Sequence, residues 1–247
     1  MIKYKINTEY EKTFKDFFLS IREQFKNNDT TIHKARNELK IISVDEISTV
    51  VKAFKVPNII NKFAYSYLRA SKAEKSYEYS VKIGKFTPVP IGYIEFYNNG
   101  LLSNSYFISE KFNYDFTIRE PLLDDNFSDK TNILKAFSKF TFDLHENGIF
   151  HNDYSPGNIL IKKENTGYIF KIVDINRMKF GELNADLRAK NFSKLWARED
   201  ELAIIAEEYL KYFKTNVDFT KKVCEYSQKN KNIKNFKKRL KGQEVND

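Results

Sequence analysis

The residues best suited to chemistry lie in the stretch HNDYSPGNIL, residues 151–160, and shortly after it. His151, Asp153 and Asn158 occur in the stretch itself. Asp174 follows after two apolar β-type runs, NILIKK and YIFKIVDI, which are separated by the turn-forming ENTG. A hairpin of these runs places Asn158 and Asp174 at the same end of their strands. Their oxygen atoms then suit Mg²⁺, which prefers hard oxygen ligands and keeps several waters.

Asp153 completes the chemistry that this stretch allows. It lies on the loop ahead of the predicted hairpin and can accept a proton from an incoming hydroxyl group. A carboxylate beside two magnesium ligands is the arrangement that phosphoryl transfer needs. The competing interpretation is a helix cap or an Asx turn, because Asp and Asn favour both for backbone reasons. Asp174 after the hairpin and a lysine on an earlier strand favour the catalytic interpretation.

Phosphoryl transfer also needs a cation on the phosphates, and Lys52 in the run VVKAF is the candidate. Glu78, in the helix that follows, can hold Lys52 by a charge-assisted hydrogen bond. Lys55 directly follows this run, and Glu74 lies one turn from Glu78 on the same helix face. The valines ahead of Lys52 favour Lys52, but the choice within each pair stays open.

Hydrophobic periodicity predicts the elements that position these residues. In residues 9–26 five apolar side chains recur at helical spacing, which predicts an amphipathic helix packed on a core: Phe14, Phe17, Phe18, Ile21 and Phe25. The runs 32–43 and 48–56 predict strands, and 71–83 predicts a helix. Residues 86–112 predict two strands joined by the turn NNG.

A second long helix is predicted over residues 129–147. Ser128 or Asp129 is its expected cap, and Gly148 is its expected stop. Its apolar stripe consists of Ile133, Phe137, Phe140 and Leu144. The elements predict an α+β protein with a β-rich N-terminal lobe, residues 1–112, and a mainly helical C-terminal lobe, residues 113–247. A ligand is expected in the cleft between the lobes.

The same residues resemble a known family. His151-Asn152-Asp153, Asn158 and Asp174 resemble the H-R-D-x-x-x-x-N and D-F-G motifs of the protein-kinase fold, and Val50-Val51-Lys52 resembles its V-A-I-K strand. The resemblance covers about residues 30–200. Six segments are more narrowly similar to the bacterial lipopolysaccharide kinases, the WaaP-like group that phosphorylates Kdo or heptose of the inner core: KARNELK, VVKAFKVPN, SKAEKSYEYS, TPVPIGYIE, HNDYSPGNIL and VDINRMKF.

The resemblance implies a two-lobed, protein-kinase-like fold with ATP and Mg²⁺ as cofactors. By position, Lys52 then contacts the α- and β-phosphates, and Glu78 pairs with it. The adenine is expected beside residues 109–112, which include Ser109 and Glu110, mainly through backbone groups.

For the loop, the resemblance implies that Asp153 is the catalytic base and that Asn158 and Asp174 bind magnesium. His151 is expected to buttress the loop rather than to take part in the chemistry.

Several departures from the kinase pattern limit what carries over. Asn152 replaces the arginine that in many protein kinases binds a phosphorylated activation loop, and Ser155 stands where protein serine/threonine kinases carry a lysine. Asp174-Ile175-Asn176 is not D-F-G, and neither A-P-E nor G-x-G-x-x-G is present. The stretch after Asp174 is also too short for a full peptide-binding half. A small or lipid-linked acceptor is therefore expected, and the resemblance to lipopolysaccharide kinases implies a sugar hydroxyl of a glycolipid. The alternatives are an atypical protein serine/threonine kinase and a non-catalytic nucleotide-binding scaffold.

Three residues near these motifs have roles that the sequence leaves open or assigns to packing. Arg177 can grip an acceptor phosphate or carboxylate bidentately, or form a structural ion pair. Tyr154 can contact the acceptor or pack in the core. Trp196 is predicted to lie in the core. His33 and His145 lack metal-ligand neighbours and are interpreted as ordinary structural residues.

Composition limits the class of protein and its partners. The 247 residues are 41% hydrophobic with a single cysteine, Cys224, so we expect a folded protein without an internal disulfide. No apolar run of about 18 residues and no secretory stretch is present, which predicts a cytoplasmic protein. The net charge is +9, concentrated in the tail QKNKNIKNFKKRLKGQ. Peripheral contact of this tail with the anionic inner face of the cytoplasmic membrane is possible, whereas the lack of an ordered basic-aromatic motif argues against nucleic acid.

Overall fold

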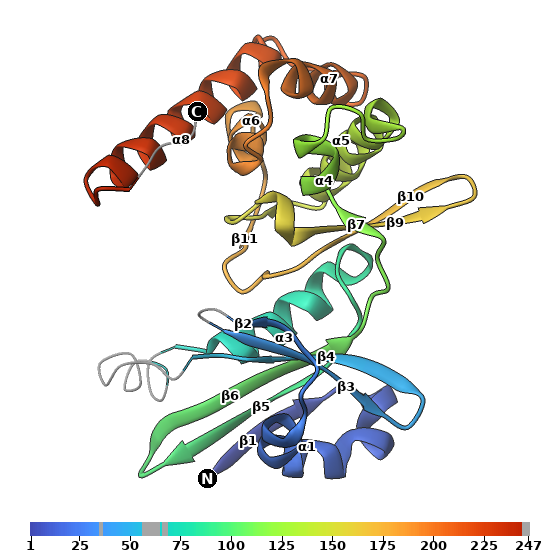
Figure 1. Ribbon diagram of the computed structural model, residues 1–247, viewed down its shortest axis with the longest axis vertical. Helices are drawn as coiled ribbons and strands as arrows, with labels where there is room; N and C mark the ends of the chain where they lie inside the picture. The colour runs from blue at the N-terminus through green and yellow to red at the C-terminus, as the bar shows by residue number, and fades with distance from the viewer. Residues whose placement is uncertain (35–36, 56–64, 66–68, 244–247) are drawn as a thin grey trace. The chain divides into compact units, whose positions relative to one another are not determined.

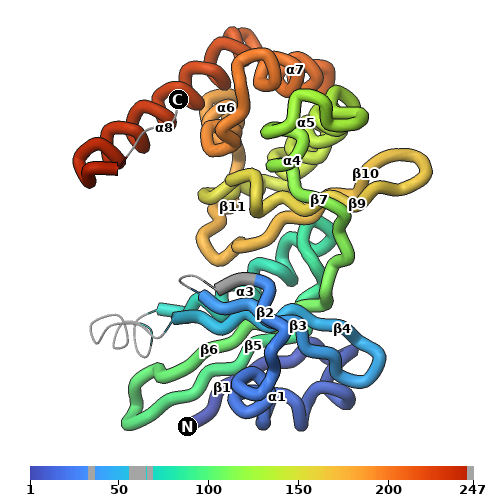
Figure 2. The backbone as a smooth tube through the Cα atoms, in the orientation of Figure 1, coloured from blue at the N-terminus to red at the C-terminus, as the bar shows by residue number. Residues whose placement is uncertain are grey.

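The computed structural model describes residues 1–34, 37–55, 65 and 69–243. Parts of two segments of the family resemblance, residues 35–36 and 56–58, lie outside the described residues, as does the side chain of His33. The chain forms two compact units, Met1–Asn113 and Tyr114–Asp247. Each is a continuous stretch of chain, which can be followed by colour in Figures 1 and 2.

Unit 1 is built on a six-stranded antiparallel sheet in the order β1-β5-β6-β4-β3-β2. Its strands are β1 (Ile2–Ile6), β2 (Thr31–Lys34), β3 (Glu38–Val44), β4 (Ile47–Ala53), β5 (Pro90–Asn98) and β6 (Leu101–Glu110). The predicted NNG turn joins β5 to β6, with Asn99 and Gly100 at φ values of 48° and 75°, as a tight hairpin turn requires. Strand β1 was not predicted, although its residues, IKYKI, alternate between apolar and polar; the strand lies at the edge of the sheet and is mostly exposed.

The helices α1 (Glu11–Asn27) and α3 (Lys72–Ile83) cover opposite faces of this sheet (Figure 1). The five predicted apolar residues of α1 are all buried, in a cluster that includes Ile94 and Ile108. Their strand neighbours Tyr93 and Phe107 pack instead in the cluster that holds Ala73 and Tyr77 of α3. Because successive side chains of a strand point to opposite faces, the residues of each strand are divided between the two helices.

Unit 2 combines short strands with a helical body. Strands β7 (Phe116–Thr117), β9 (Ile159–Glu164) and β10 (Gly167–Ile172) form a sheet in the order β10-β9-β7, and β8 (Ile149–Phe150) pairs with β11 (Lys179–Phe180). The helices are α4 (Arg119–Leu123), α5 (Lys130–Glu146), α6 (Ala185–Asn191), α7 (Glu199–Leu210) and α8 (Phe219–Arg239). None of the helices in the described ranges is long and apolar enough to cross a membrane.

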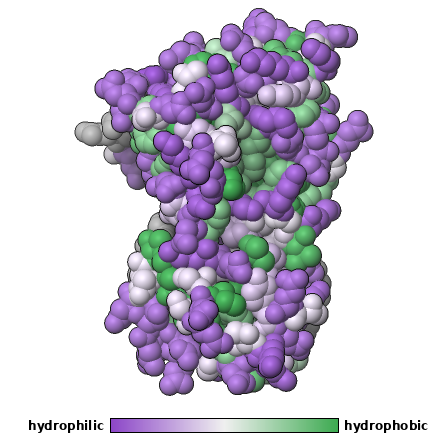
Figure 3. All heavy atoms as spheres, turned by 90° about the vertical axis from the view of Figure 1, so that its right-hand side faces the viewer, coloured by the Kyte–Doolittle hydropathy of each residue, from purple (hydrophilic) through white to green (hydrophobic). Residues whose placement is uncertain are grey.

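Helix α5 agrees closely with its prediction. It begins after Asp129 and is followed by Gly148, which has a φ of 65°. A side chain at Gly148 would lie 2.8 Å from the carbonyl oxygen of Gly181, so the position requires glycine for space as well as for φ. The apolar stripe of α5 packs in an aromatic core with Phe192 and Tyr209. Hydrophilic side chains dominate the face of the molecule that Figure 3 shows.

His145, in the last turn of α5, is buried in this core. Its Nδ1 lies 2.7 Å from the hydroxyl oxygen of Tyr209, which also accepts a hydrogen bond from Arg188. Burial, followed by the nearby Arg188 guanidinium, lowers the pKa of His145 to about 3. The imidazole is therefore neutral in the folded protein at neutral pH.

Because an unfolded chain protonates histidine near pH 6.5, it binds more protons than the folded state between about pH 6.5 and 3. Stability should fall across this range as the pH is lowered, by up to about 1.4 kcal/mol per pH unit from this one group. We expect His145→Gln to show a shallower loss than the parent chain between about pH 6.5 and 4. Urea unfolding followed by circular dichroism measures it, and parallel slopes would contradict the assignment.

Candidate active site

The candidate site of unit 2 is built on the hairpin of β9 and β10. Ile159 pairs with Ile172, and the ladder continues by one bond, from the Val173 N–H to the Asn158 carbonyl oxygen at 3.0 Å. Asn158 and Asp174 therefore lie at the same end of the hairpin, as the sequence predicts. Asn158 closes a 3₁₀ turn, Pro156–Asn158, that leads directly into β9.

Asn158 fixes the loop that carries Asp153. Its Nδ2 donates to the Asp153 carbonyl oxygen at 2.9 Å and to Ser155 Oγ at 3.1 Å. The Ser155 N–H also donates to the Asp153 carbonyl oxygen, at 2.8 Å. Since both side-chain bonds use Nδ2, the amide oxygen Oδ1 can serve as a ligand for a cation.

His151 joins the loop to the end of β10. Its Nδ1 accepts a hydrogen bond from the Asp153 N–H at 3.0 Å, and its Nε2 lies 3.0 Å from the Val173 carbonyl oxygen. Only the neutral tautomer with the proton on Nε2 satisfies both contacts. Burial lowers the pKa of His151 and so favours this neutral form. These contacts agree with the predicted buttressing role.

Asp174 takes a backbone conformation that suits a functional position. Its φ is 57°, in the left-handed region that Asp tolerates better than most residues. Asn176 donates to Asp174 Oδ1 at 2.7 Å, and the intervening Ile175 is buried. The hydrogen bond from Asn176 thus orients the Asp174 carboxylate, and the buried Ile175 fixes the backbone between the two residues.

The donor set fits magnesium better than a transition metal. In the part of the chain that the structure describes, no group of three or more His, Cys, Asp and Glu side chains is suited to a metal ion. Asn158 and Asp174 instead offer one amide oxygen and one carboxylate. Magnesium is commonly held by one or two carboxylates together with waters and substrate phosphates, so this small set is sufficient.

Asp153 is half-exposed, and its neighbour is a lysine that the sequence analysis did not single out. The side chain of Asp153 is 40% exposed, and its Oδ1 lies 3.7 Å from Lys194 Nζ. Lys194 also donates to the carbonyl oxygen of Asn152. Lys194 lies far from the catalytic stretch in the sequence and belongs to no motif. The one signal was Ser155, which stands where protein serine/threonine kinases carry a lysine, so that a lysine from another part of the chain could take its place.

The candidate phosphate-binding residues lie in unit 1. Lys52 is half-buried in β4 between Leu39 and Phe107, on the α3 face of the sheet, with its Nζ 5.4 Å from the centre of the Phe54 ring. Lys55 lies beyond the end of β4 and is exposed. The strand position thus favours Lys52, as the valine pattern did.

On α3, the two glutamates differ in their surroundings. Glu74 accepts hydrogen bonds from Lys3 Nζ at 2.6 Å and from the Tyr93 hydroxyl at 3.1 Å, whereas Glu78 is exposed. Glu74 is thus already paired with Lys3. The pairing of Lys52 with Glu78 stays a prediction.

The segment expected to meet adenine is the end of β6. Ser109 is buried opposite Val50, and the Glu110 side chain accepts a hydrogen bond from the Tyr10 hydroxyl. The Glu110 N–H donates to the Val89 carbonyl oxygen at 2.9 Å, and the Lys111 N–H donates to the Ser48 carbonyl oxygen at 2.8 Å. Since these N–H groups are already used, an adenine would need the backbone groups that follow them.

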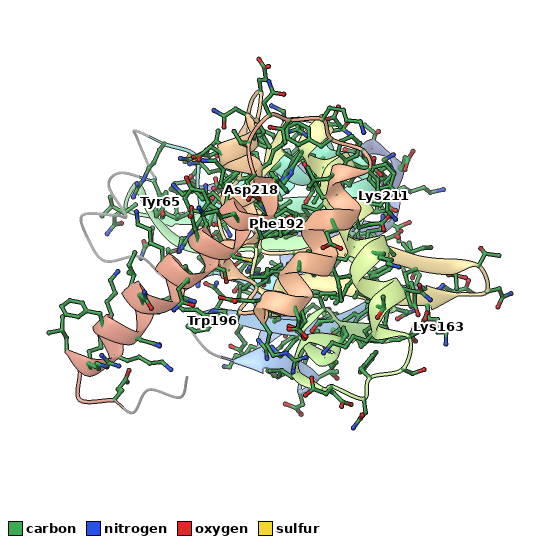
Figure 4. The ribbon with its side chains drawn as sticks, turned by 90° about the horizontal axis from the view of Figure 1, so that it is seen from above. Tyr65, Lys163, Phe192, Trp196, Lys211 and Asp218 are labelled. Carbon is green, nitrogen blue, oxygen red and sulfur yellow. The ribbon has the colours of Figure 1, made fainter. Side chains whose placement is uncertain are left out.

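The structure decides several roles that the sequence left open. Tyr154 is fully buried, stacked on Phe137, and its hydroxyl lies 2.8 Å from Thr141 Oγ1, so it packs in the core. Arg177 is exposed. The prediction for Trp196 was wrong: it is 36% exposed with a φ of 61°, because the chain turns sharply before α7 (Figure 4).

No protein-family model and no curated protein matches the sequence. Among solved structures, the chain is similar to WaaP in complex with acyl carrier protein, with a TM-score of 0.61, 94% of this chain and 99% of that chain covered, and 11% sequence identity. In all, 1249 chains of solved structures match. At this identity the likeness shows the fold alone: the chain has a mixed α and β fold like that of WaaP, in agreement with the predicted kinase-like class.

The loop geometry predicts that His151→Ala will loosen the candidate site. The substitution removes the acceptor for the Asp153 N–H and the donor for the Val173 carbonyl, and each buried group left unpaired costs about 1–3 kcal/mol. We expect faster hydrogen exchange at the Asp153 amide, measured by NMR. The control is His145→Gln, a change at a buried histidine outside this loop, which should leave the Asp153 amide protected. Unchanged protection in His151→Ala would show that the imidazole does not hold the loop.

Proposed function

We propose that the chain is a kinase that transfers the γ-phosphate of ATP to a hydroxyl group. The observation that supports this most is the half-exposed carboxylate of Asp153 on a loop that His151 and Asn158 hold from both sides. A general base must be fixed in place and still accessible to its substrate, and Asp153 meets both conditions.

In the proposed reaction, the acceptor hydroxyl oxygen attacks the γ-phosphorus, and the bond from phosphorus to the ADP oxygen breaks. Asp153 orients the hydroxyl and takes its proton. Lys52 would bind the phosphates, and Glu78 would orient Lys52. Asn158 and Asp174 would hold Mg²⁺, which neutralises charge on the phosphates when it is bound.

The acceptor we propose is a sugar hydroxyl of a lipopolysaccharide-core-like glycolipid, Kdo or heptose. The six segments that resemble lipopolysaccharide kinases support this choice, and the fold shared with WaaP is compatible with it. An atypical protein serine/threonine kinase is the nearest alternative, and phosphoamino-acid analysis separates the two. A non-catalytic scaffold would bind ATP without magnesium-dependent turnover.

The proposed chemistry predicts that Asp153→Asn will lose transfer but keep ATP binding. An amide cannot take the proton, so kcat should fall by about 10²–10⁴-fold. The assay is transfer of labelled γ-phosphate into a bacterial membrane extract, with glycolipid and protein separated, and ATP affinity measured in parallel.

The matched control is Asp143→Asn on α5. Asp143 is 39% exposed and pairs with Lys139, so the change in charge and exposure is nearly the same as at Asp153. Full transfer activity in Asp153→Asn would contradict the assignment of the base. Label that appears only in protein would favour the protein-kinase alternative.

We further propose that the C-terminal half of α8 contacts an anionic membrane surface. Ile233, Phe236 and Leu240 are 46%, 61% and 72% exposed and recur at helical spacing, among many lysines. These turns extend beyond the other helices of unit 2 (Figure 1). Exposed apolar residues flanked by cations are typical of helices that lie in the membrane interface.

Membrane contact predicts that Phe236→Ser/Leu240→Ser will weaken binding to phosphatidylglycerol vesicles by about tenfold or more, because both apolar side chains leave the interface. Vesicle co-sedimentation at fixed salt measures it. Leu123→Ser on α4, where the leucine is 79% exposed, is the control and should bind normally. Equal binding by all three proteins would rule out the stripe as the contact.

A further inference from the structure

Two side chains of α8 tie it to the segment that carries Lys194. Asn230 Nδ2 donates to the Ser193 carbonyl oxygen at 2.8 Å, and Lys231 Nζ donates to the Ala197 carbonyl oxygen at 2.9 Å. Between these two anchors the chain presents Lys194 and Trp196. The position of α8 beside this segment is therefore fixed by hydrogen bonds and not only by packing.

The anchored segment and α8 gather positive charge beside the candidate base. Lys194 Nζ lies 3.7 Å from the Asp153 carboxylate. Lys234 of α8 is half-buried; burial lowers its pKa, as do the charges of Lys194 and Lys238, whereas Asp153 acts in the opposite direction. Positive charge therefore exceeds negative charge among the four side chains of Lys194, Lys234, Lys238 and Asp153.

Trp196 supplies an aromatic surface in the same place. Lys234 Nζ lies over its ring, 4.5 Å from the centroid, and the residue is partly exposed (Figure 4). Its φ of 61° is unfavourable for a bulky side chain. Strained residues of this kind persist where the surrounding structure holds them, and they cluster at ligand-binding sites.

We propose that Lys194, Trp196 and Lys234 form an acceptor subsite that binds an anionic group of the sugar whose hydroxyl meets Asp153. The inference rests on the proposed kinase function and narrows its substrate class. The acceptor is a sugar that carries a carboxylate or a phosphate close to the hydroxyl that is phosphorylated. A neutral sugar would satisfy Asp153 but would offer neither lysine an anionic group of the substrate.

The geometry gives each group of such an acceptor a separate role. The hydroxyl donates to Asp153, while the anion takes charge-assisted hydrogen bonds from Lys194 and Lys234. Lys194 contacts both regions, because it already neighbours the Asp153 carboxylate. The exposed part of the Trp196 ring offers the apolar C–H face of the sugar a contact surface.

The chain contains one tryptophan, so its fluorescence reports directly on this subsite. The full chain without ATP is titrated with glucuronate, glucose 6-phosphate and glucose at constant ionic strength, and the indole N–H signal is followed by NMR in parallel. We expect saturable changes with both anions and at least about tenfold weaker binding of glucose. A response to only one anion would identify carboxylate or phosphate as the group bound.

Lys234→Gln is the main variant, because it leaves the contacts between Lys194 and the catalytic loop intact, and Lys194→Gln is the second. Each should weaken binding of the anions by about tenfold. Lys229→Gln removes the same charge from an exposed position of α8 and should bind normally. Equal losses of anion binding in all three variants would indicate diffuse electrostatic attraction and would overturn the subsite. Glucose binding as tight as that of the anions would also overturn it, and so would the absence of a saturable change in both fluorescence and NMR.

Magnesium-dependent phosphate transfer by the same proteins separates this inference from the proposed function. Transfer without a preference for anionic acceptors overturns the subsite and leaves the kinase. Lysine-dependent anion binding without any transfer supports an anion site at these residues but overturns the kinase, and with it the acceptor role of that site. Lysine-dependent binding of ATP, with no binding of either sugar anion, assigns Lys194 and Lys234 to the nucleotide and also overturns the subsite.

Discussion

The candidate site depends on one neutral imidazole. His151 accepts from the Asp153 N–H and contacts the Val173 carbonyl, and the Val173 N–H continues the ladder to Asn158. A loop residue, a turn residue and the end of a strand are thereby joined through a single buried ring. Because the ring must keep an acceptor nitrogen for this purpose, its burial and lowered pKa are structural requirements of the site.

Much of the fold was predictable because its strongest signals are local. The apolar spacing of α1, the Asn99-Gly100 turn and the stop of α5 at Gly148 each follow from a few neighbouring residues, and all are present. The hairpin that brings Asn158 and Asp174 together was predictable for the same reason. Strand β1 was missed even though its apolar and polar residues alternate, because the run is short and most of its side chains stay exposed at the edge of the sheet.

The parts of the site that were missed come from distant contacts. Lys194 reaches Asp153 because the end of α6 lies beside the loop, where Asn191 accepts a hydrogen bond from the His151 N–H. Trp196 lies at a position where the backbone takes the left-handed conformation, and it is partly exposed. Neither the contact of Lys194 nor the exposure of Trp196 follows from hydrophobic periodicity, which predicts that an aromatic residue near a helix lies in the core. At Tyr154 the position within the catalytic stretch suggested contact with the acceptor, yet the ring packs against Phe137. Motif spacing identified the backbone framework of the site, whereas its charge balance required the tertiary structure.

Helix α8 has two different surfaces on a single rigid element. Lys231 and Lys234 face the segment beside Asp153, whereas Ile233 and Phe236 face outward. Since each residue turns the helix by about 100°, these directions are fixed relative to one another by helical phase. A tilt of α8 caused by a contact on its outward side would therefore also move Lys234, so such a contact would change the charge beside the candidate base.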